Sequence, residues 1–162
     1  MAAKGKWGRL TSAMPAPKAD GPLSVLTKVS TKLHVAIFRR SKGRLMGKFD
    51  EAPLLVLHHV GAKSGRPRQT PLIYLEDGAN LVVVASMGGQ EQNPAWFHNL
   101  VANPEVEVEI GGQRRAVTAR RMTPAEADVR WPRLRQMWPA FEVYKTRTDR
   151  EFPVFFLEPR NP

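Results

Sequence analysis

The chain contains no cysteine, which excludes disulfide bonds and cysteine-ligated metal centres and is compatible with a reducing cytoplasm. Its apolar runs are short. None approaches the ~20 residues that span a bilayer, and the N-terminus lacks the apolar segment of a secretory signal. At 162 residues the chain suffices for one domain with its own core. We therefore expect a cytoplasmic protein with a single domain and no metal site.

Acidic residues are almost absent from the first 48 positions, which we call the leader. The leader holds 11 Lys or Arg and a single acid, Asp20, whereas residues 49–162 hold 14 residues of each sign. The whole formal charge of +10 therefore resides in the leader. A neutral domain argues against a nucleic-acid-binding surface, which is typically basic.

Two segments are predicted within the leader. Residues 1–22 mix Gly, Pro, Ala and Lys without periodicity, so we expect a mobile basic tail. Residues 23–40 are predicted to form an amphipathic helix that opens a single domain over 23–162. Apolar residues gather on one side and cations on the other: Leu26, Val29, Leu33 and Ile37 against Lys28, Lys32 and Arg39. We favour packing of the apolar side on the domain. The alternative, compatible with loose docking, is peripheral contact at the inner face of the cell membrane, where each cation contributes about 1 kcal/mol.

Beyond the leader, period-2 patterns and turn signals predict about six strands: 53–60, 70–76, 81–86, 105–110, 113–121 and 152–158. Helices are predicted at 94–101, with Asn93 as its N-cap, and from the capping box at Thr123 to Met137. Residues 138–144 are predicted to be irregular. Because turns rather than helices join most strands, we expect an antiparallel α+β barrel.

One hairpin leaves its register open. A two-residue loop at Gly111–Gly112 sets Glu109 opposite Arg114, and a three-residue loop sets it opposite Arg115. Either register pairs an acid with a base, worth a few tenths of a kcal/mol.

A cationic loop joins the first two predicted strands. Lys63, Arg66 and Arg68 lie within six residues, and no acid occurs from 52 to 75. The loop is not a Walker motif, because Ala62 precedes the lysine and a strand follows. Its glycines let a ligand approach the backbone closely, so the loop is a candidate site for a phosphate or carboxylate. A solvated hairpin turn is the alternative.

Other residues give weaker signals. His58 and His59 are adjacent on a strand, so they should point to opposite faces and cannot hold one metal. Ser64 and Ser86 lack the context of a hydrolase nucleophile. Four aromatic residues belong either to the core or to the wall of a flat ligand site: Trp96, Trp138, Phe141 and Tyr144.

Four motifs occur in succession: V-G-A-K-S-G-R-P-R, A-S-M-G-G, N-P-A-W-F-H-N-L and A-N-P. In this order they closely resemble the deazaflavin-dependent nitroreductase family of actinobacteria, which uses coenzyme F420. The resemblance covers about residues 53–159, including T-D-R at 148–150. It implies a split β-barrel fold related to flavin-binding oxidoreductases, in agreement with the α+β barrel above.

The resemblance also implies roles for particular residues. The phosphate of the coenzyme tail would be bound by the cationic loop, with Lys63, Ser64 and Arg68 in contact and Gly65 and Arg66 nearby. The deazaflavin ring would be bordered by Pro71, Ile73, Ser86, Met87, Gly88, Gly89, Trp96 and Asn99. The substrate side would be lined by Trp138, Phe141 and Tyr144, with Tyr144 as the candidate catalytic hydroxyl.

The implied activity is transfer of a hydride from reduced coenzyme F420 to an electron-poor small molecule: a quinone, a conjugated enone or lactone, or a nitro compound. Two alternatives stay open. One is an FMN-binding split-barrel protein, and the other is a deazaflavin-binding or membrane-associated module without catalysis.

The chain departs from the family pattern at four positions. Ala62 and Met87 stand where cations are usual, which should weaken binding of the coenzyme tail by roughly 1–3 kcal/mol. Trp138 and Phe141 also lack the hydroxyl that tyrosine would offer there. Tyr144 is therefore the remaining candidate for protonating the acceptor.

Overall fold

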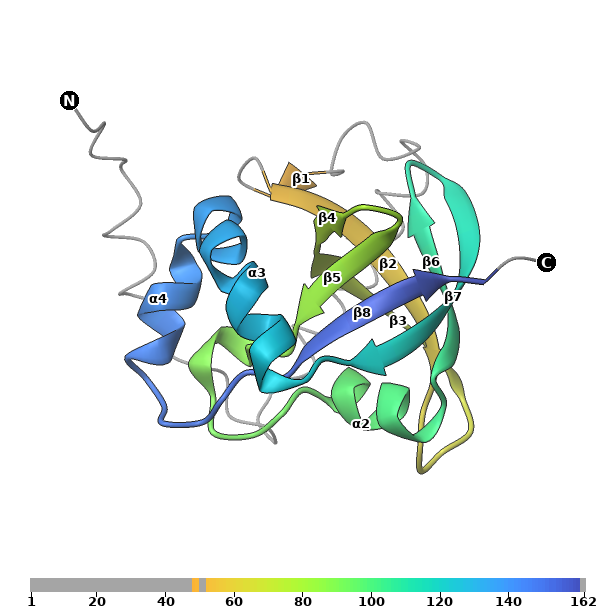
Figure 1. Ribbon diagram of the computed structural model, residues 1–162. Helices are drawn as coiled ribbons and strands as arrows, with labels where there is room; N and C mark the ends of the chain where they lie inside the picture. Colours follow the sequence, from red (N-terminus) through yellow and green to blue (C-terminus); the bar gives the residue numbers. More distant parts are fainter. Residues whose placement is uncertain (1–47, 50–51, 161–162) are drawn as a thin grey trace.

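The computed structural model describes residues 48–49 and 52–160 (Figure 1). The predicted basic tail, the predicted helix at 23–40 and any membrane contact of the leader lie outside the described residues.

The described chain is built around one antiparallel sheet of eight strands in the order β1-β2-β6-β7-β8-β5-β4, with β3 paired to β2. The strands are β1 (Lys48–Phe49), β2 (Ala52–Val60), β3 (Pro67–Ile73), β4 (Leu75–Asp77), β5 (Asn80–Val84), β6 (Glu105–Ile110), β7 (Gln113–Arg121) and β8 (Val154–Pro159). Three helices and a 3-10 turn complete the described elements: α2 (Ala95–Ala102), α3 (Pro124–Met137), α4 (Ala140–Lys145) and η2 (Met87–Gly89).

The sheet curls into a barrel because β3 and β4 act as one bent strand. Only Tyr74 separates them, and its N–H donates to the carbonyl oxygen of Pro53 (3.2 Å). On one side of the bend β3 pairs with β2, and on the other β4 pairs with β5. Counted in this way, and leaving the two-residue β1 aside, the barrel has six strands. The α+β barrel expected from the sequence is therefore confirmed.

Burial on both faces explains the continuous apolar runs of β5 and β8. Val83 and Phe155 face the barrel interior, whereas their neighbours Val82 and Phe156 face the helices. By contrast, β6 alternates over most of its length, because one face is solvated there: Val106 and Val108 are buried, and Glu105 and Glu107 are exposed. Glu109, on the same face as the two exposed acids, is buried. Full burial of each large apolar side chain contributes about 1.5–3 kcal/mol.

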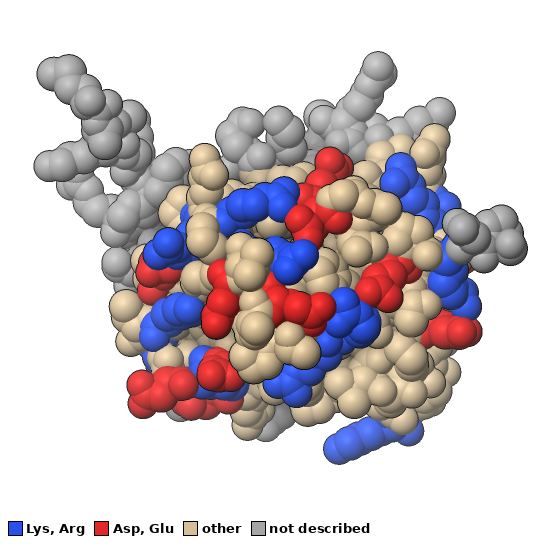
Figure 2. All heavy atoms as spheres, in the orientation of Figure 1, with Lys and Arg blue, Asp and Glu red and all other residues tan. Residues whose placement is uncertain are grey.

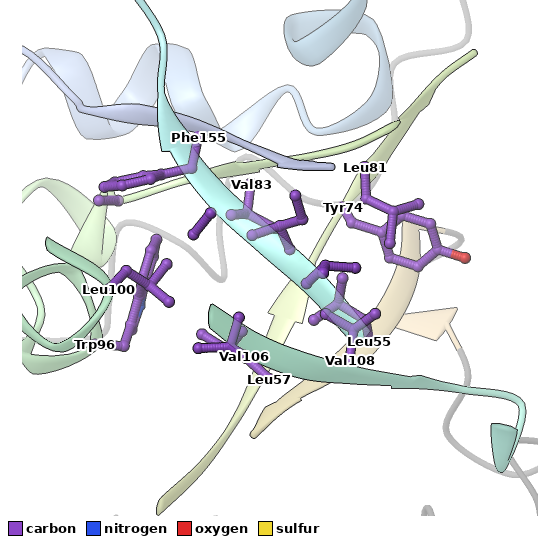
Figure 3. Packing of buried hydrophobic residues seen from close by; sticks show 14 residues of the cluster. Leu55, Leu57, Tyr74, Leu81, Val83, Trp96, Leu100, Val106, Val108 and Phe155 are labelled. Carbon is purple, nitrogen blue, oxygen red and sulfur yellow. The ribbon is translucent and has the colours of Figure 1, made fainter. Parts of the chain in front are cut away.

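Two apolar clusters hold the helices to the barrel. In the interior cluster, Trp96 and Leu100 point from α2 toward Phe155 (Figure 3), and the Trp96 and Phe155 rings meet edge to face at 6.1 Å. The outer cluster places α3 and α4 against β5 and β8, with Leu134 fully buried. At the start of α3 the predicted capping box forms: the Thr123 hydroxyl accepts from the Glu126 N–H, and the Glu126 carboxylate accepts from the Thr123 N–H.

Two local expectations change, and one open alternative is decided. The segment 138–144, predicted to be irregular, contains α4. The N-cap of α2 is Pro94 and not Asn93, because the Asn93 amide oxygen accepts a hydrogen bond from Arg150. The open hairpin register is settled by a two-residue loop, with Glu109 opposite Arg114.

Candidate functional site

The cationic loop is a compact turn between β2 and β3. The Gly61 N–H donates to the Arg66 carbonyl oxygen (2.9 Å), and the Gly65 N–H donates to the Gly61 carbonyl oxygen (2.8 Å). Gly65 has a φ of 62°, a left-handed conformation that favours glycine. The loop side chains Lys63, Arg66 and Arg68 are exposed, and none pairs with a carboxylate within the described part of the chain.

Gly61 creates a close convergence of polar side chains within this loop. A Cβ atom at Gly61 would lie 2.5 Å from the Ser64 Oγ and 3.2 Å from the Arg68 Nε. Only the absence of a side chain lets the hydroxyl and the guanidinium gather over the same backbone position. The predicted loop residues Ser64 and Arg68 therefore lie together.

A cavity of about 500 Å³ opens farther along β3. Its lining residues come from β2, β3, β5, the η2 turn and the helices: Leu54, Thr70, Pro71, Leu72, Ile73, Val84, Ser86, Met87, Gly88, Pro94, Trp96, Trp138, Phe141 and Tyr144. The lining is mainly apolar and includes four aromatic rings, which suits a flat ligand.

The predicted ring-bordering residues Pro71, Ile73, Ser86, Met87, Gly88 and Trp96 line this cavity, as do the predicted substrate-side residues Trp138, Phe141 and Tyr144. Two predicted residues are absent from this lining among the described residues. Asn99 is buried and forms hydrogen bonds with Ala62 and His59, and Gly89 is buried against α4.

The turn η2 forms one rim of the cavity in an unusual backbone conformation. Met87, Gly88 and Gly89 all have positive φ, at 47°, 65° and 82°. Met87 thus occupies a left-handed conformation in which a side chain costs energy. The Arg147 guanidinium donates to the Gly88 carbonyl oxygen (3.1 Å) and contributes to holding this turn.

Arg150 fixes the segment behind the same rim. Its half-buried guanidinium donates to the carbonyl oxygens of Ala85 (3.2 Å), Ser86 (3.0 Å) and Gln90 (3.0 Å), and to the Asn93 side chain. The planar fork of arginine donors suits such a convergence of oxygens. Burial lowers the pKa of Arg150 from its ordinary value. Arg150 lies in the T-D-R motif, but sequence reasoning gave it no role.

Gly89 sets the distance between η2 and α4. A Cβ atom at Gly89 would lie 2.4 Å from the Tyr144 carbonyl oxygen, so the two backbones touch. The Tyr144 ring packs edge to face on Phe141 at 6.2 Å. The position of Tyr144 in the cavity wall therefore depends on the missing side chain of Gly89.

The two adjacent histidines point to opposite sides of β2, as expected. The His58 Nε2 lies 2.9 Å from the Glu109 Oε2 of β6, while His59 is buried and contacts Asn99 and Thr70. The pKa of His59 is lowered from 6.5 to about 4. Burial is the largest cause, followed by the charge of Arg68 and then by His58. His59 and Thr70 were not assigned to the site from sequence, because their partners lie 11 to 40 residues away.

No group of three His, Asp or Glu side chains within the described residues is arranged to hold a metal ion. None of the described helices combines the length and apolar character needed to cross a membrane.

Comparisons with known proteins agree on one family. The family described as F420H(2)-dependent quinone reductase matches residues 30–159. An F420H(2)-dependent quinone reductase of Mycobacterium tuberculosis H37Rv is 41% identical over 135 residues, covering 80% of this chain and 89% of that protein.

Solved structures agree with this comparison. One described as an F420-H2 dependent reductase is 36% identical with a TM-score of 0.60, covering 65% of this chain and 94% of that chain. Another, described as a domain-swapped dimer, is 31% identical with a TM-score of 0.63, covering 82% of this chain and 99% of that chain. These likenesses confirm the split-barrel fold and the resemblance drawn from the motifs. The chain belongs to the F420H(2)-dependent quinone reductase family.

Proposed function

We propose that this F420-dependent oxidoreductase transfers a hydride from reduced coenzyme F420 to a quinone. The observation that carries the proposal is the course of β3, which starts at the cationic loop and continues along the wall of the aromatic cavity. A ligand with an anionic tail and a flat ring would match both features at once. Family membership supports the identity of the coenzyme and of the acceptor class.

The residues present fit such a coenzyme. Lys63, Ser64 and Arg68 would hold its phosphate through charge-assisted hydrogen bonds, since no carboxylate among the described residues competes for the cations. The convergence over Gly61 brings two of these three side chains together. The ring would lie between Pro71 and Ile73 of β3 and the rim at Ser86–Gly88, with Trp96 at one end. FMN, the alternative from the sequence, finds no support in the family comparison.

Reduced coenzyme F420 supplies a hydride from C5 of its deazaflavin ring. A quinone that accepts the hydride needs one further proton to become a hydroquinone. The Tyr144 hydroxyl lies in the cavity wall and would donate that proton to the developing oxyanion, and water would reprotonate the half-exposed Tyr144. Trp138 and Phe141 would position the acceptor and exclude water, and no side chain forms a covalent bond.

We extend the proposal to conjugated enones, lactones and nitro compounds as slower acceptors. Their reduction places negative charge on oxygen atoms that need hydrogen-bond donors. Tyr144 is the hydroxyl that the aromatic substrate side offers, because Trp138 and Phe141 have none. Hydride addition to a quinone or to an enone leaves a single oxyanion, whereas reduction of a nitro group places charge on two oxygen atoms and so makes the largest demand on Tyr144. Rates with a quinone, an enone and a nitroaromatic compound at equal concentration would test this order, and a faster nitroaromatic reaction would contradict it.

The assignment is tested by titrating the full chain with oxidised coenzyme F420 and with FMN, and by turnover with reduced coenzyme and a quinone. Lys63→Glu and Arg68→Glu should each weaken coenzyme binding by about ten- to a hundredfold, because each removes a charge-assisted hydrogen bond. Arg135→Glu makes the same charge change on α3 and should leave binding unchanged. Equal affinity of all three variants, or tighter binding of FMN, would overturn the assignment.

We also propose a role for the segments outside the described residues. The family match over residues 30–159 lies within the single domain that we propose over 23–162, and a basic tail at 1–22 would precede that domain. The excess of cations in the leader would draw the enzyme to an anionic membrane surface, where lipid-soluble quinones concentrate.

A further inference from the structure

A chain of hydrogen bonds connects the cationic loop with the cavity. The Ala62 N–H donates to the Asn99 Oδ1 (2.8 Å), and the Asn99 Nδ2 lies 2.9 Å from the His59 Nδ1. The His59 Nε2 lies 3.0 Å from the Thr70 Oγ1. Thr70 itself lines the cavity. Four residues from β2, the loop, α2 and β3 thus form one continuous path.

The direction of every bond in this path follows from its first donor. A backbone N–H can only donate, so the Asn99 oxygen faces Ala62 and the Asn99 amide nitrogen faces His59. The amide nitrogen also donates, so the His59 Nδ1 is the acceptor and its proton resides on Nε2. The Nε2–H then donates to the Thr70 oxygen. The hydroxyl hydrogen of Thr70 is left to donate elsewhere, and no acceptor for it is found among residues 52–160.

The environment of His59 preserves this direction at neutral pH. The side chain is 5% exposed, and the pKa near 4 keeps the imidazole neutral. A protonated ring would place an N–H against the Asn99 amide nitrogen and break the path. The path therefore has one polarity over the range in which the enzyme would work.

Hydroxyl donors are few in the cavity wall. Among the described lining residues, only Thr70, Ser86 and Tyr144 carry a side-chain hydroxyl. Ser86 and Tyr144 belong to the rim at η2 and α4, whereas Thr70 lies on β3. Two positions after Arg68 on the same strand, Thr70 shares a strand face with that cation and lies between the loop and the ring-sized cavity.

We propose that Thr70 donates a hydrogen bond to a carbonyl oxygen of the ligand in the cavity, and that His59 and Asn99 are positioning residues that point its hydroxyl hydrogen there. The carbonyl belongs either to the pyrimidine edge of the coenzyme ring or to the quinone. This inference rests on the proposed function. It also gives Asn99 a role different from the ring contact that the motif resemblance implies.

The test compares Thr70→Val, Thr70→Ser and a control, Thr118→Val, which removes a hydroxyl from β7 away from the cavity. Two quantities are measured: the dissociation constant of oxidised coenzyme F420 and the KM for a quinone. Thr70→Val should raise one of them about tenfold, the effect of losing one hydrogen bond. Thr70→Ser and Thr118→Val should stay within about threefold of the wild type. A rise in the coenzyme dissociation constant assigns the ring carbonyl, and a rise in the quinone KM alone assigns the quinone.

Two further measurements distinguish a role of His59 in orienting the Thr70 hydroxyl from a role in folding stability alone. His59→Leu should raise the same constant, the coenzyme dissociation constant or the quinone KM, that Thr70→Val raises. The double variant should raise it no further than Thr70→Val alone, because the path is already broken. In the free wild-type protein, ¹⁵N NMR should show a neutral His59 protonated at Nε2.

Unchanged binding and KM in Thr70→Val, additive losses in the double variant, or a His59 proton on Nδ1 would each overturn the inference. If the wild type does not bind the coenzyme, the proposed function fails together with it. If the wild type binds and Thr70→Val behaves like the wild type, only the role of Thr70 fails.

Discussion

Arg150 illustrates how a residue outside the cavity determines its wall. Its guanidinium binds three carbonyl oxygens between Ala85 and Gln90 and the side chain of Asn93. Replacement by methionine keeps an unbranched, shorter side chain and removes every donor. We expect Arg150→Met to lower the free energy of unfolding by about 2–4 kcal/mol, since several buried oxygens lose a charged partner.

Arg150→Lys tests the geometry separately from the charge. A lysine ammonium cannot reach all these oxygens at once, so we expect an intermediate loss of stability and faster amide exchange from Ser86 to Gln90. Chemical denaturation and hydrogen exchange measure both effects. A lysine variant as stable as the wild type would show that charge alone suffices.

His59 makes stability depend on pH in a defined direction. Its pKa is about 4 in the folded chain against an ordinary 6.5, so between these values the unfolded chain binds a proton that the folded chain does not. Stability therefore rises with pH: the contribution is complete above about pH 6.5 and is lost as the pH falls toward 4. The total change is up to about 3 kcal/mol.

His59→Gln should flatten this part of the stability profile, whereas His98→Gln, the same change at an exposed position of α2, should preserve it. Urea denaturation at intervals from pH 4 to 7 provides the measurement. Parallel profiles for the wild type and His59→Gln would refute the assignment.

At the scale of elements, the contact between η2 and α4 decides where Tyr144 lies in the cavity wall. Gly88 and Gly89 both have positive φ, but only a Cβ atom at Gly89 would meet the Tyr144 backbone. Gly88→Ala should therefore cost only the backbone strain, about 1 kcal/mol. Gly89→Ala should cost more and displace α4 with Tyr144.

The two glycine variants are compared by denaturation and by quinone turnover with reduced coenzyme. We expect turnover to fall at least tenfold in Gly89→Ala and to change little in Gly88→Ala. Equal turnover in both would show that Tyr144 does not need its present position.

Elements with strong local patterns could be predicted from the sequence, and those fixed by distant contacts could not. The alternation of β6 and the capping box of α3 are encoded within a few residues. The helix α4 was missed because its six residues follow Pro139 without a side-chain cap, and the outer apolar cluster stabilises it instead. Asn93 resembled an N-cap, but Arg150, 57 positions later, binds its side chain.

The candidate site shows the same division. Its loop and its aromatic residues form short motifs, and the structure brings Trp96, Trp138, Phe141 and Tyr144 to one cavity. The path through His59 could not be predicted, because Asn99 reaches it from another element 40 positions away. The bend at Tyr74, which closes the barrel, likewise depends on Pro53 of another strand.

At the scale of the whole molecule, charges of both signs alternate over the described surface. Figure 2 shows Lys and Arg interspersed with Asp and Glu across the face that carries α3, α4 and β8. Several of these residues form pairs, such as Arg120 with Glu126 (3.0 Å) and Arg130 with Asp77 (3.0 Å). The described domain therefore adds little net attraction to an anionic surface, and the excess of ten positive charges stays with the leader.

This division of charge predicts how the full chain meets a membrane. Each leader cation near an anionic surface contributes about 1 kcal/mol, and the attraction falls off within a Debye length. The full chain should therefore sediment with vesicles that contain phosphatidylserine at low salt, and should be released by about 0.5 M salt. Replacing Lys28, Lys32 and Arg39 by glutamine should weaken this binding by about a hundredfold. Replacing Arg115, Arg121 and Arg135 by glutamine makes the same charge change on the domain and should weaken it far less. Equal losses in the two triple variants would show that net charge, and not the leader, draws the full chain to the anionic surface.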